Sequence, residues 1–216
     1  MKIENVAHLA NIVRETSSGA LCESIIKGMN ICFESVVRPC FECAISNSVL
    51  MEGSINDPNA PIFAAIKNGD WDTTGDLDTD YPIFMASMQK SKHPGSLTMY
   101  SLDEYKEKNA RLFKVAGFDA GFAIAGDGDI ISVHNNSDYA NVAPAMIAKA
   151  KELGGDHLDH FDFEKLNDVY GGAGFEVYDT YKWDDQYAPT EWNYERDGRP
   201  DVKLRGLPSY LEKIKN

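Results

Sequence analysis

The chain has 216 residues, 43% of them hydrophobic, and its 34 acidic residues outnumber its 21 basic ones to give a net charge of −13. Because every contact with a nucleic-acid phosphate needs a cation, this charge and the absence of a basic run argue against nonspecific nucleic-acid binding. The sequence shows no apolar run long enough for a membrane span and no leader pattern, so we expect a cytoplasmic protein.

The first hundred residues predict helices joined by segments of mixed character. Apolar residues at helical spacing predict amphipathic helices at 5–15 and 20–32. Further along we expect a strand at 41–51, a helix at 61–67, an acidic loop at 70–80, a helix at 81–90 and a strand at 96–100. Ser101 and Glu104 match a capping box, which begins a helix that we expect to run to about residue 114.

The cysteines and the acidic loop both raise the question of a metal ion. Cys40 and Cys43 have the spacing of a zinc knuckle or redox motif, but no second such pair follows, so we expect buried, reduced cysteines. The loop at 70–80 carries five aspartates, yet the twelfth position of an EF-hand reading is Tyr81 and not glutamate, so we expect a solvated loop. His157 and His160 lie three apart on a predicted strand and should face opposite sides. We predict no metal site.

The second half of the chain predicts alternating strands and helices. Two alternating runs, 121–125 and 129–134, flank Gly126-Asp-Gly128 and predict an antiparallel hairpin, since glycine tolerates the positive φ of a tight turn. The remaining predicted elements are a helix at 140–153, a strand at 157–161, a helix at 163–173, a strand at 175–178 and a last edge strand at 201–205.

Two sets of residues carry a resemblance to a known family. Residues 165–177 resemble the end of the GNAT N-acetyltransferase core, in which a helix tyrosine is followed by Gly-Phe and the next strand. The run 127–136, with Tyr187-Ala-Pro, Trp192-Asn-Tyr194 and residues 197–202, is similar to a GNAT-like group found largely in phage and mobile elements. The resemblance covers about residues 97–205.

This resemblance implies an α/β (α+β) fold with a mixed, mostly antiparallel central sheet flanked by helices. We assign residues 96–216 to this core and residues 1–95 to N-terminal helices and an insertion, and expect about one and a half domains from the length.

The resemblance also implies a function, which is transfer of an acetyl or related acyl group from acetyl-CoA to an amine of a small molecule or protein. In the family, the strand before the main helix splays from its neighbour and frees backbone amides for the thioester. The following loop binds pyrophosphate at a helix N-terminus. The implied cofactor-binding residues are Ser132, Val133, Asn135, Asn136, Tyr139, Ala140, Val142 and Ala143. The loop at 136–145 lacks the glycines and the basic residue of the usual signature, and its Asp138 would repel a phosphate.

Catalytic candidates follow from the same comparison. Tyr170 matches the position of the family tyrosine that protonates the leaving thiolate, although a core tyrosine on an apolar helix face explains it equally well. A general base for the amine would be His134, Asp201 or Glu191, and no spacing selects among them.

The segment 182–208 interleaves large aromatic residues with charged ones. One interpretation is a pocket wall that holds the acceptor through Tyr187, Glu191 and Trp192. The other, which we favour, is a lid folded over the sheet edge with Arg199 paired to a carboxylate.

A hypothesis from a different class follows from the charge. An acidic face imitates a phosphate backbone, so the protein could instead be a non-catalytic inhibitor that occupies a basic groove on a host nucleic-acid enzyme. Its partner would then be a host protein. A homodimer is left open under both hypotheses.

Overall fold

The computed structural model describes residues 55–91, 94–189 and 192–215. The chain divides between Glu52 and Gly53 into two compact units, and the described residues all belong to the second. The helices predicted at 5–15 and 20–32, the strand at 41–51 and the four cysteines lie outside the described residues. Residues 55–91, assigned from sequence to the N-terminal part, belong to the same unit as the predicted core.

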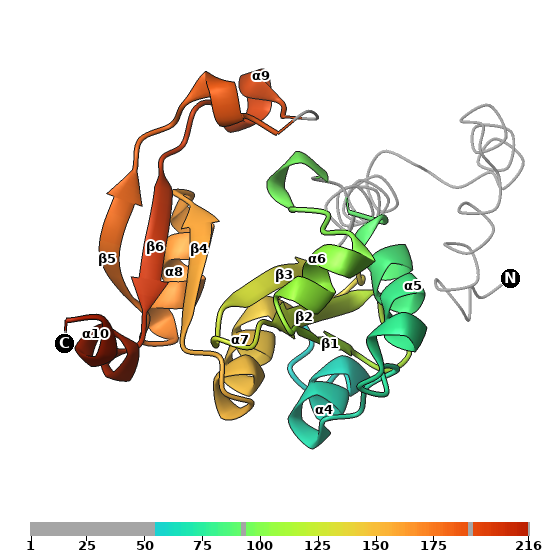
Figure 1. The fold of residues 1–216 in the computed structure, drawn as a ribbon. Coiled ribbons are helices and arrows are strands. Elements are labelled where there is room, and N and C mark those ends of the chain that lie inside the picture. Colours follow the sequence, from blue (N-terminus) through green and yellow to red (C-terminus); the bar gives the residue numbers. More distant parts are fainter. Residues whose placement is uncertain (1–54, 92–93, 190–191, 216) are drawn as a thin grey trace, which may run out of the picture. The chain divides into compact units, whose positions relative to one another are not determined.

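The first sheet is an antiparallel meander in the order β1-β2-β3 (Figure 1). Its strands are β1 (Arg111–Lys114), β2 (Ala120–Ile124) and β3 (Ile130–Asn135). The predicted hairpin between β2 and β3 is confirmed, and its turn requires glycine because Gly128 has a φ of 99°.

Strand β1 occupies the region where the sequence predicted the end of a helix, so that prediction is wrong. Helix α6 (Leu102–Glu107) begins with the predicted capping box of Ser101 and Glu104. It stops early because Asn109 takes a positive φ of 48°, after which residues 111–114 alternate between the two sides of a sheet.

Helices cover both faces of the first sheet. On one face α4 (Pro61–Asn68) and α7 (Val142–Glu152) pack their apolar sides against Phe122 and Ile124. On the other face α5 (Leu77–Met88) and α6 pack against Ala123 and Ile131. Successive β2 residues thus point into different clusters, as strand alternation requires.

Helix α5 and the segment after it differ from prediction. The helix begins at Leu77, four residues before the expected start at Tyr81, because Asp78 and Asp80 in its first turn favour the helix N-terminus. The strand predicted at 96–100 is absent. Pro94–Ser96 form a short 3-10 helix, and Leu97 and Tyr100 pack as loop side chains against the α5–α6 cluster.

The second sheet has the antiparallel order β4-β6-β5. It contains β4 (His157–Phe161), β5 (Glu176–Tyr181) and β6 (Val202–Gly206). The last strand is therefore central and not at the edge as predicted, because its register joins β4 on one side and β5 on the other. Helix α8 (Glu164–Gly172) precedes β5, and α10 (Pro208–Ile214) follows β6. The 3-10 helix at Asp185–Tyr187 and α9 (Tyr194–Asp197) lie between β5 and β6.

Strands β3 and β4 meet at one point. An isolated parallel bridge pairs Asp129, just before β3, with His157, the first residue of β4. Beyond this bridge the two strands belong to different sheets. The described residues thus form a mixed α/β fold in which two antiparallel sheets join at a single parallel bridge.

Candidate functional site

Strand β3 contains a bulge at the residues predicted to hold the thioester. Gly121 pairs with His134 and Ala123 pairs with Ile131, so Phe122 alone faces both Ser132 and Val133. Ser132 has a φ of 57°, which is costly for a residue other than glycine. A bulge leaves its extra residue outside the ladder and redirects the local backbone groups.

His134, a predicted base, is enclosed behind this bulge. Its Nδ1 lies 3.0 Å from the Ser132 carbonyl oxygen, which can only accept, so Nδ1 carries the proton. Its Nε2 therefore accepts from the Ser87 hydroxyl at 2.8 Å. The side chain is 4% exposed, and burial lowers its pKa. A neutral, fully bonded histidine of this kind holds the strand in place.

The predicted pyrophosphate loop is held by hydrogen bonds within itself and to Ser87 and Ile55. The Asn135 amide donates to the Tyr139 carbonyl oxygen at 2.8 Å, and the Asn136 amide donates to the Ser87 carbonyl oxygen at 2.8 Å. The Ala140 N–H donates to the Ile55 carbonyl oxygen at 3.0 Å. The Asn136 N–H donates to the Asp119 carbonyl oxygen at 2.7 Å and the Tyr139 N–H to the Ser137 hydroxyl at 3.3 Å. These three of the predicted amides are therefore already engaged.

The first turn of α7 follows this loop. Asn141 precedes the helix in a left-handed conformation and provides no side-chain cap. Val142 is fully buried, and Ala143 is half-buried. The N–H groups of this first turn receive no acceptor from the Asn141 side chain, and they lie where the resemblance implies an anion.

Asp201 is held in an ion pair at the start of β6. Its carboxylate lies 2.6 Å from the Lys182 ammonium and accepts the Trp183 N–H at 3.3 Å. The hydrogen bond from Lys182 lowers the pKa of Asp201. A carboxylate so paired is a weaker base than an ordinary aspartate.

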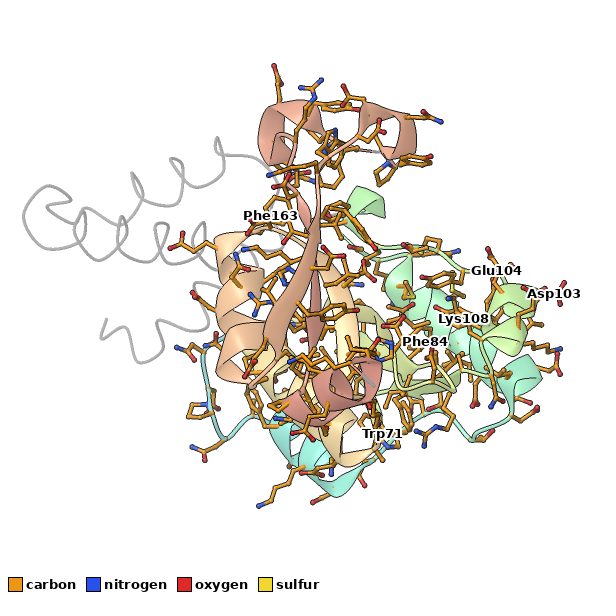
Figure 2. All side chains as sticks on the ribbon, turned by 60° about the vertical axis from the view of Figure 1, so that its left-hand side comes forward. Trp71, Phe84, Asp103, Glu104, Lys108 and Phe163 are labelled. Atoms are coloured by element: carbon orange, nitrogen blue, oxygen red, sulfur yellow. The ribbon has the colours of Figure 1, made fainter. Side chains whose placement is uncertain are left out.

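The aromatic tail forms a small cluster of its own. Trp192 is 8% exposed. Its ring lies 4.6 Å from the Phe161 ring and 4.8 Å from the Trp183 ring. It also stacks on Phe163, which is labelled in Figure 2. Tyr187 is 78% exposed, and Glu191 lies outside the described residues. The expected pairing of Arg199 to a carboxylate is confirmed at 2.9 Å. Its partner is Asp185.

Tyr170 has a buried ring and an open hydroxyl. Its side chain is 7% exposed, and its ring lies 4.9 Å from that of His160. Within the described part of the chain the hydroxyl has no hydrogen-bond partner, and no fully buried side-chain polar atom there lacks one. The hydroxyl must therefore reach solvent. Burial, with a smaller effect of the Asp159 charge, raises the pKa of Tyr170 to about 12.

A buried polar network fixes the ring against which Tyr170 packs. His160 donates from Nδ1 to the Phe161 carbonyl oxygen at 2.7 Å and accepts at Nε2 from Arg205 at 2.8 Å. Arg205 also donates to the carbonyl oxygen of Phe175 and to Asn167, both at 2.8 Å. His157 instead faces the opposite side of β4, where its ring stacks on Tyr210, as expected for positions three apart.

Two carboxyl groups that the sequence interpretation missed lie at the junction of β3 and β4. Residues paired across a bridge point to one face, so Asp129 and His157 share a face, and Asp159 returns to it two residues later. Desolvation, opposed by His157 and assisted by the Asp159 charge, raises the pKa of Asp129 to about 6. Desolvation also raises the pKa of Asp159.

Asp159 is exposed to solvent, yet enough protein surrounds it to disfavour its charge. Around it are Tyr100, whose pKa is raised by burial and then by Asp159 and Asp129, and Tyr178, which is 37% exposed. We call Asp129, His157, Asp159, Tyr100 and Tyr178 the fork site. Tyr170 packs on His160, which faces the other side of β4.

A hollow adjoins Asp129, since the neighbouring Gly128 is part of its wall. It is lined by Gly75, Leu77, Asn109, Ala110, Arg111, Ile124, Ala125, Gly126, Gly128 and Gly154. Arg111 is the one charged residue of this lining, and its guanidinium donates to the Leu153 carbonyl oxygen at 2.7 Å. The hollow therefore offers little chemistry.

The described residues contain neither a cluster of metal-binding side chains nor a helix that could cross a membrane. Within 55–91, 94–189 and 192–215, no three histidine, cysteine or acidic side chains gather closely enough to hold a metal ion. No helix of the same residues has the length and apolar character needed to cross a membrane.

Comparisons with protein-family models, with curated proteins and with solved structures give no significant match.

Proposed function

We propose that the protein is a GNAT-like N-acyltransferase that transfers an acetyl or related acyl group from acyl-CoA to an amine of a small molecule or protein. The main support is the fork itself. Strands β3 and β4 separate beyond one parallel bridge, β3 carries a bulge in its ladder with β2, and the Tyr170 hydroxyl is open. The same proposal places the protein in the cytoplasm and, from the resemblance, in a phage or mobile element.

The chain's residues fit the thioester end of acyl-CoA better than its pyrophosphate end. Acyl-CoA supplies the acyl group as a thioester. Backbone N–H groups at Ser132 and Val133 would donate to its carbonyl oxygen as negative charge develops there. At the pyrophosphate end, the Ala140 N–H already donates to the Ile55 carbonyl oxygen. The N–H groups of Val142 and Ala143 at the start of α7 would then bind the pyrophosphate.

Tyr170 supports the acid half of the reaction. A pKa of about 12 keeps the phenol protonated at neutral pH, and a hydroxyl without a protein partner can donate to a leaving thiolate. His134 is enclosed and Asp201 is ion-paired, so we take Asp159, which has no ion-pair partner among the described residues, as the base.

The proposed step balances with these two groups. An ammonium passes one proton to the Asp159 carboxylate, and the free amine forms the C–N bond. The C–S bond breaks, and the thiolate takes the Tyr170 proton. The surplus proton on nitrogen then returns the Tyr170 phenol to its neutral form.

Calorimetric titration of the purified protein with acetyl-CoA and with CoA tests the proposal. Micromolar binding of acetyl-CoA is expected. If neither ligand binds at millimolar concentration, the acyltransferase proposal is wrong.

The acidic-inhibitor hypothesis gains no support from the loop at 70–80. Asp72 lies 2.5 Å from Lys114, and Asp78 lies 2.6 Å from Lys106. Asp80 is 1% exposed and accepts the N–H groups of Thr74 and Gly75. Asp70 accepts from the Asn68 amide at 3.5 Å and Asp76 from the Thr79 hydroxyl at 2.5 Å. The loop is therefore not the simply solvated one that the sequence predicted, since all five of its aspartates have partners within the protein.

A further inference from the structure

We propose that β5 is a docking edge, which binds an extended basic segment of a partner protein as an added strand of the second sheet. This inference goes beyond the proposed function and does not depend on acyl transfer. Three features of β5 support it: an open backbone edge, exposed apolar side chains on both faces, and negative charge that the protein leaves unpaired.

The backbone of β5 has one open edge. The strand pairs with β6 alone, and Figure 1 shows β6 between β5 and β4. Within the described residues, no backbone group of Glu176–Tyr181 bonds to backbone outside this ladder. The Thr180 N–H donates to the Asp179 carboxylate at 2.7 Å, which indicates that it points away from β6. Backbone groups without a strand partner are a template for another strand.

Both faces of β5 are open as well. All six of its residues are exposed, whereas β4 and β6 each contain buried residues. Val177, Tyr178 and Tyr181 are 43%, 37% and 58% exposed, and no other helix or strand of the described residues has more than one exposed large hydrophobic side chain. Apolar side chains gathered in this way on one exposed element are typical of an interaction surface.

The pairing with β6 places apolar side chains on each face of the sheet. Val177 lies opposite Arg205, and Tyr181 lies opposite Val202. Arg205 and Val202 are three apart on β6, so they and the residues paired with them point to opposite faces. An added strand would therefore have an apolar neighbour on either face, and cross-strand pairs of this kind stabilise a sheet.

The unpaired charge of β5 is negative. Glu176 has no ion pair among the described residues, and the Asp179 carboxylate accepts only the Thr180 N–H. These two acids pair with residues two apart on β6 and so share a face. The neighbouring lysines are already neutralised. Lys203 lies 2.7 Å from Asp162, and Lys182 lies 2.6 Å from Asp201.

This charge selects the partner. A second copy of the chain would bring the same two acids and the same net charge of −13, so it would be repelled. The bulge at Tyr178 also opposes pairing between identical edges. A segment with lysine or arginine at alternate positions would instead place its cations on the face of Glu176 and Asp179. Its intervening apolar residues would then lie on the face of Val177.

The test uses the full chain and three labelled heptapeptides with blocked ends, KVKVKVK, EVEVEVE and KVKPKVK. Fluorescence anisotropy at low ionic strength measures their binding. KVKVKVK should bind at least about tenfold more tightly than either of the others. EVEVEVE carries the opposite charge, whereas KVKPKVK keeps the charge but has a central proline, which cannot donate to a strand ladder.

Hydrogen exchange of the wild-type protein locates the bound peptide. With KVKVKVK bound, the Thr180 amide should exchange at least about tenfold more slowly, because it then donates to the peptide backbone. The amides of β2, which is buried, should keep their rates. Association through charge alone would leave the Thr180 rate unchanged.

Variants separate the contribution of the backbone from that of the charge. Thr180→Pro removes the outward N–H and should weaken KVKVKVK binding about tenfold. Glu176→Lys combined with Asp179→Lys should reverse the preference, so that EVEVEVE binds more tightly. Glu164→Lys combined with Asp168→Lys changes two exposed acids of α8 by the same charge and should keep the wild-type preference.

Each outcome decides the proposal. Equal binding of KVKPKVK, an unchanged exchange rate at Thr180 with KVKVKVK bound, or no binding at millimolar peptide would each overturn it. Dimers in sedimentation that Thr180→Pro abolishes would show that a second copy occupies the edge, which also refutes a basic partner. Melting curves identify a variant that fails to fold, and the exchange measurement then decides because it needs no variant.

Discussion

The two sheets of the protein are covered differently. All five residues of β2 are buried between α4 and α7 on one face and α5 and α6 on the other. All six residues of β5 are exposed. The first sheet is therefore built as a core, while the second leaves much of its surface to solvent.

Buried polar groups are paired in both sheets. In the first sheet Ser87 is paired with His134 and Tyr105 with Ser132. In the second sheet Arg205 donates to His160 and to Asn167. Asp129 and the Tyr170 hydroxyl have no such partner among the described residues and are open to solvent.

The largest expected effect tests the first sheet as the source of stability. Phe122 is fully buried, and its ring lies 5.1 Å from Phe113 and 5.7 Å from Trp71. Phe122→Ala should lower the free energy of unfolding by about 3–5 kcal/mol. Tyr181→Ala on β5, where the side chain is 58% exposed, should change it by less than about 0.5 kcal/mol. Urea denaturation of both variants measures the contrast, and similar losses would contradict the division of the molecule.

Removing one tyrosine hydroxyl from each region should lower activity in one variant and stability in the other. Tyr170→Phe removes a hydroxyl without a protein partner, so turnover should fall about 10²-fold while the melting temperature stays close to that of the wild type. Tyr105→Phe removes a hydrogen bond of 2.7 Å to Ser132 and should cost about 1 kcal/mol of stability. Steady-state kinetics and thermal melting measure the two effects. Unchanged turnover would remove Tyr170 from the mechanism.

The ionised form of Asp129 should destabilise the protein, so its effect should depend on pH. Its pKa is raised to about 6, so the folded state binds a proton more tightly than the unfolded chain does. That stability is present below the unfolded pKa near 4 and is lost as pH rises through 6. Asp129→Asn should therefore raise the free energy of unfolding at pH 7.5 by about 1–2 kcal/mol and have little effect at pH 4. Denaturation at both pH values measures it; a loss of stability at pH 7.5 would mean that the carboxylate has a favourable partner.

Local signals in the sequence were enough to predict much of the fold. The glycines between β2 and β3 and the capping box at Ser101 were found because each depends on neighbouring residues. Strand β1 was missed because its alternation spans four residues only. The central position of β6 was missed because strand order depends on pairing with β4 and β5, which no local pattern encodes.

The candidate site was harder to predict for the same reason. Ser132 and Val133 were named from the resemblance, and the structure places the bulge there. Asp129 and Asp159 are separated by thirty residues, and a parallel bridge alone brings them to one face. The sequence shows that both aspartates lie in or next to predicted strands. It does not show that they lie close together or that they lack partners.

The smallest expected effect concerns Asp201, which the sequence offered as a base. Its carboxylate is paired to Lys182, whose side chain is 86% exposed, so the pair is screened by solvent. Asp201→Asn should leave turnover within about twofold and the melting temperature unchanged. Asp159→Asn, measured in the same assay, should lower turnover because the amine loses its proton acceptor. The reverse pattern, with Asp201 essential and Asp159 dispensable, would move the base from the fork to the aromatic tail.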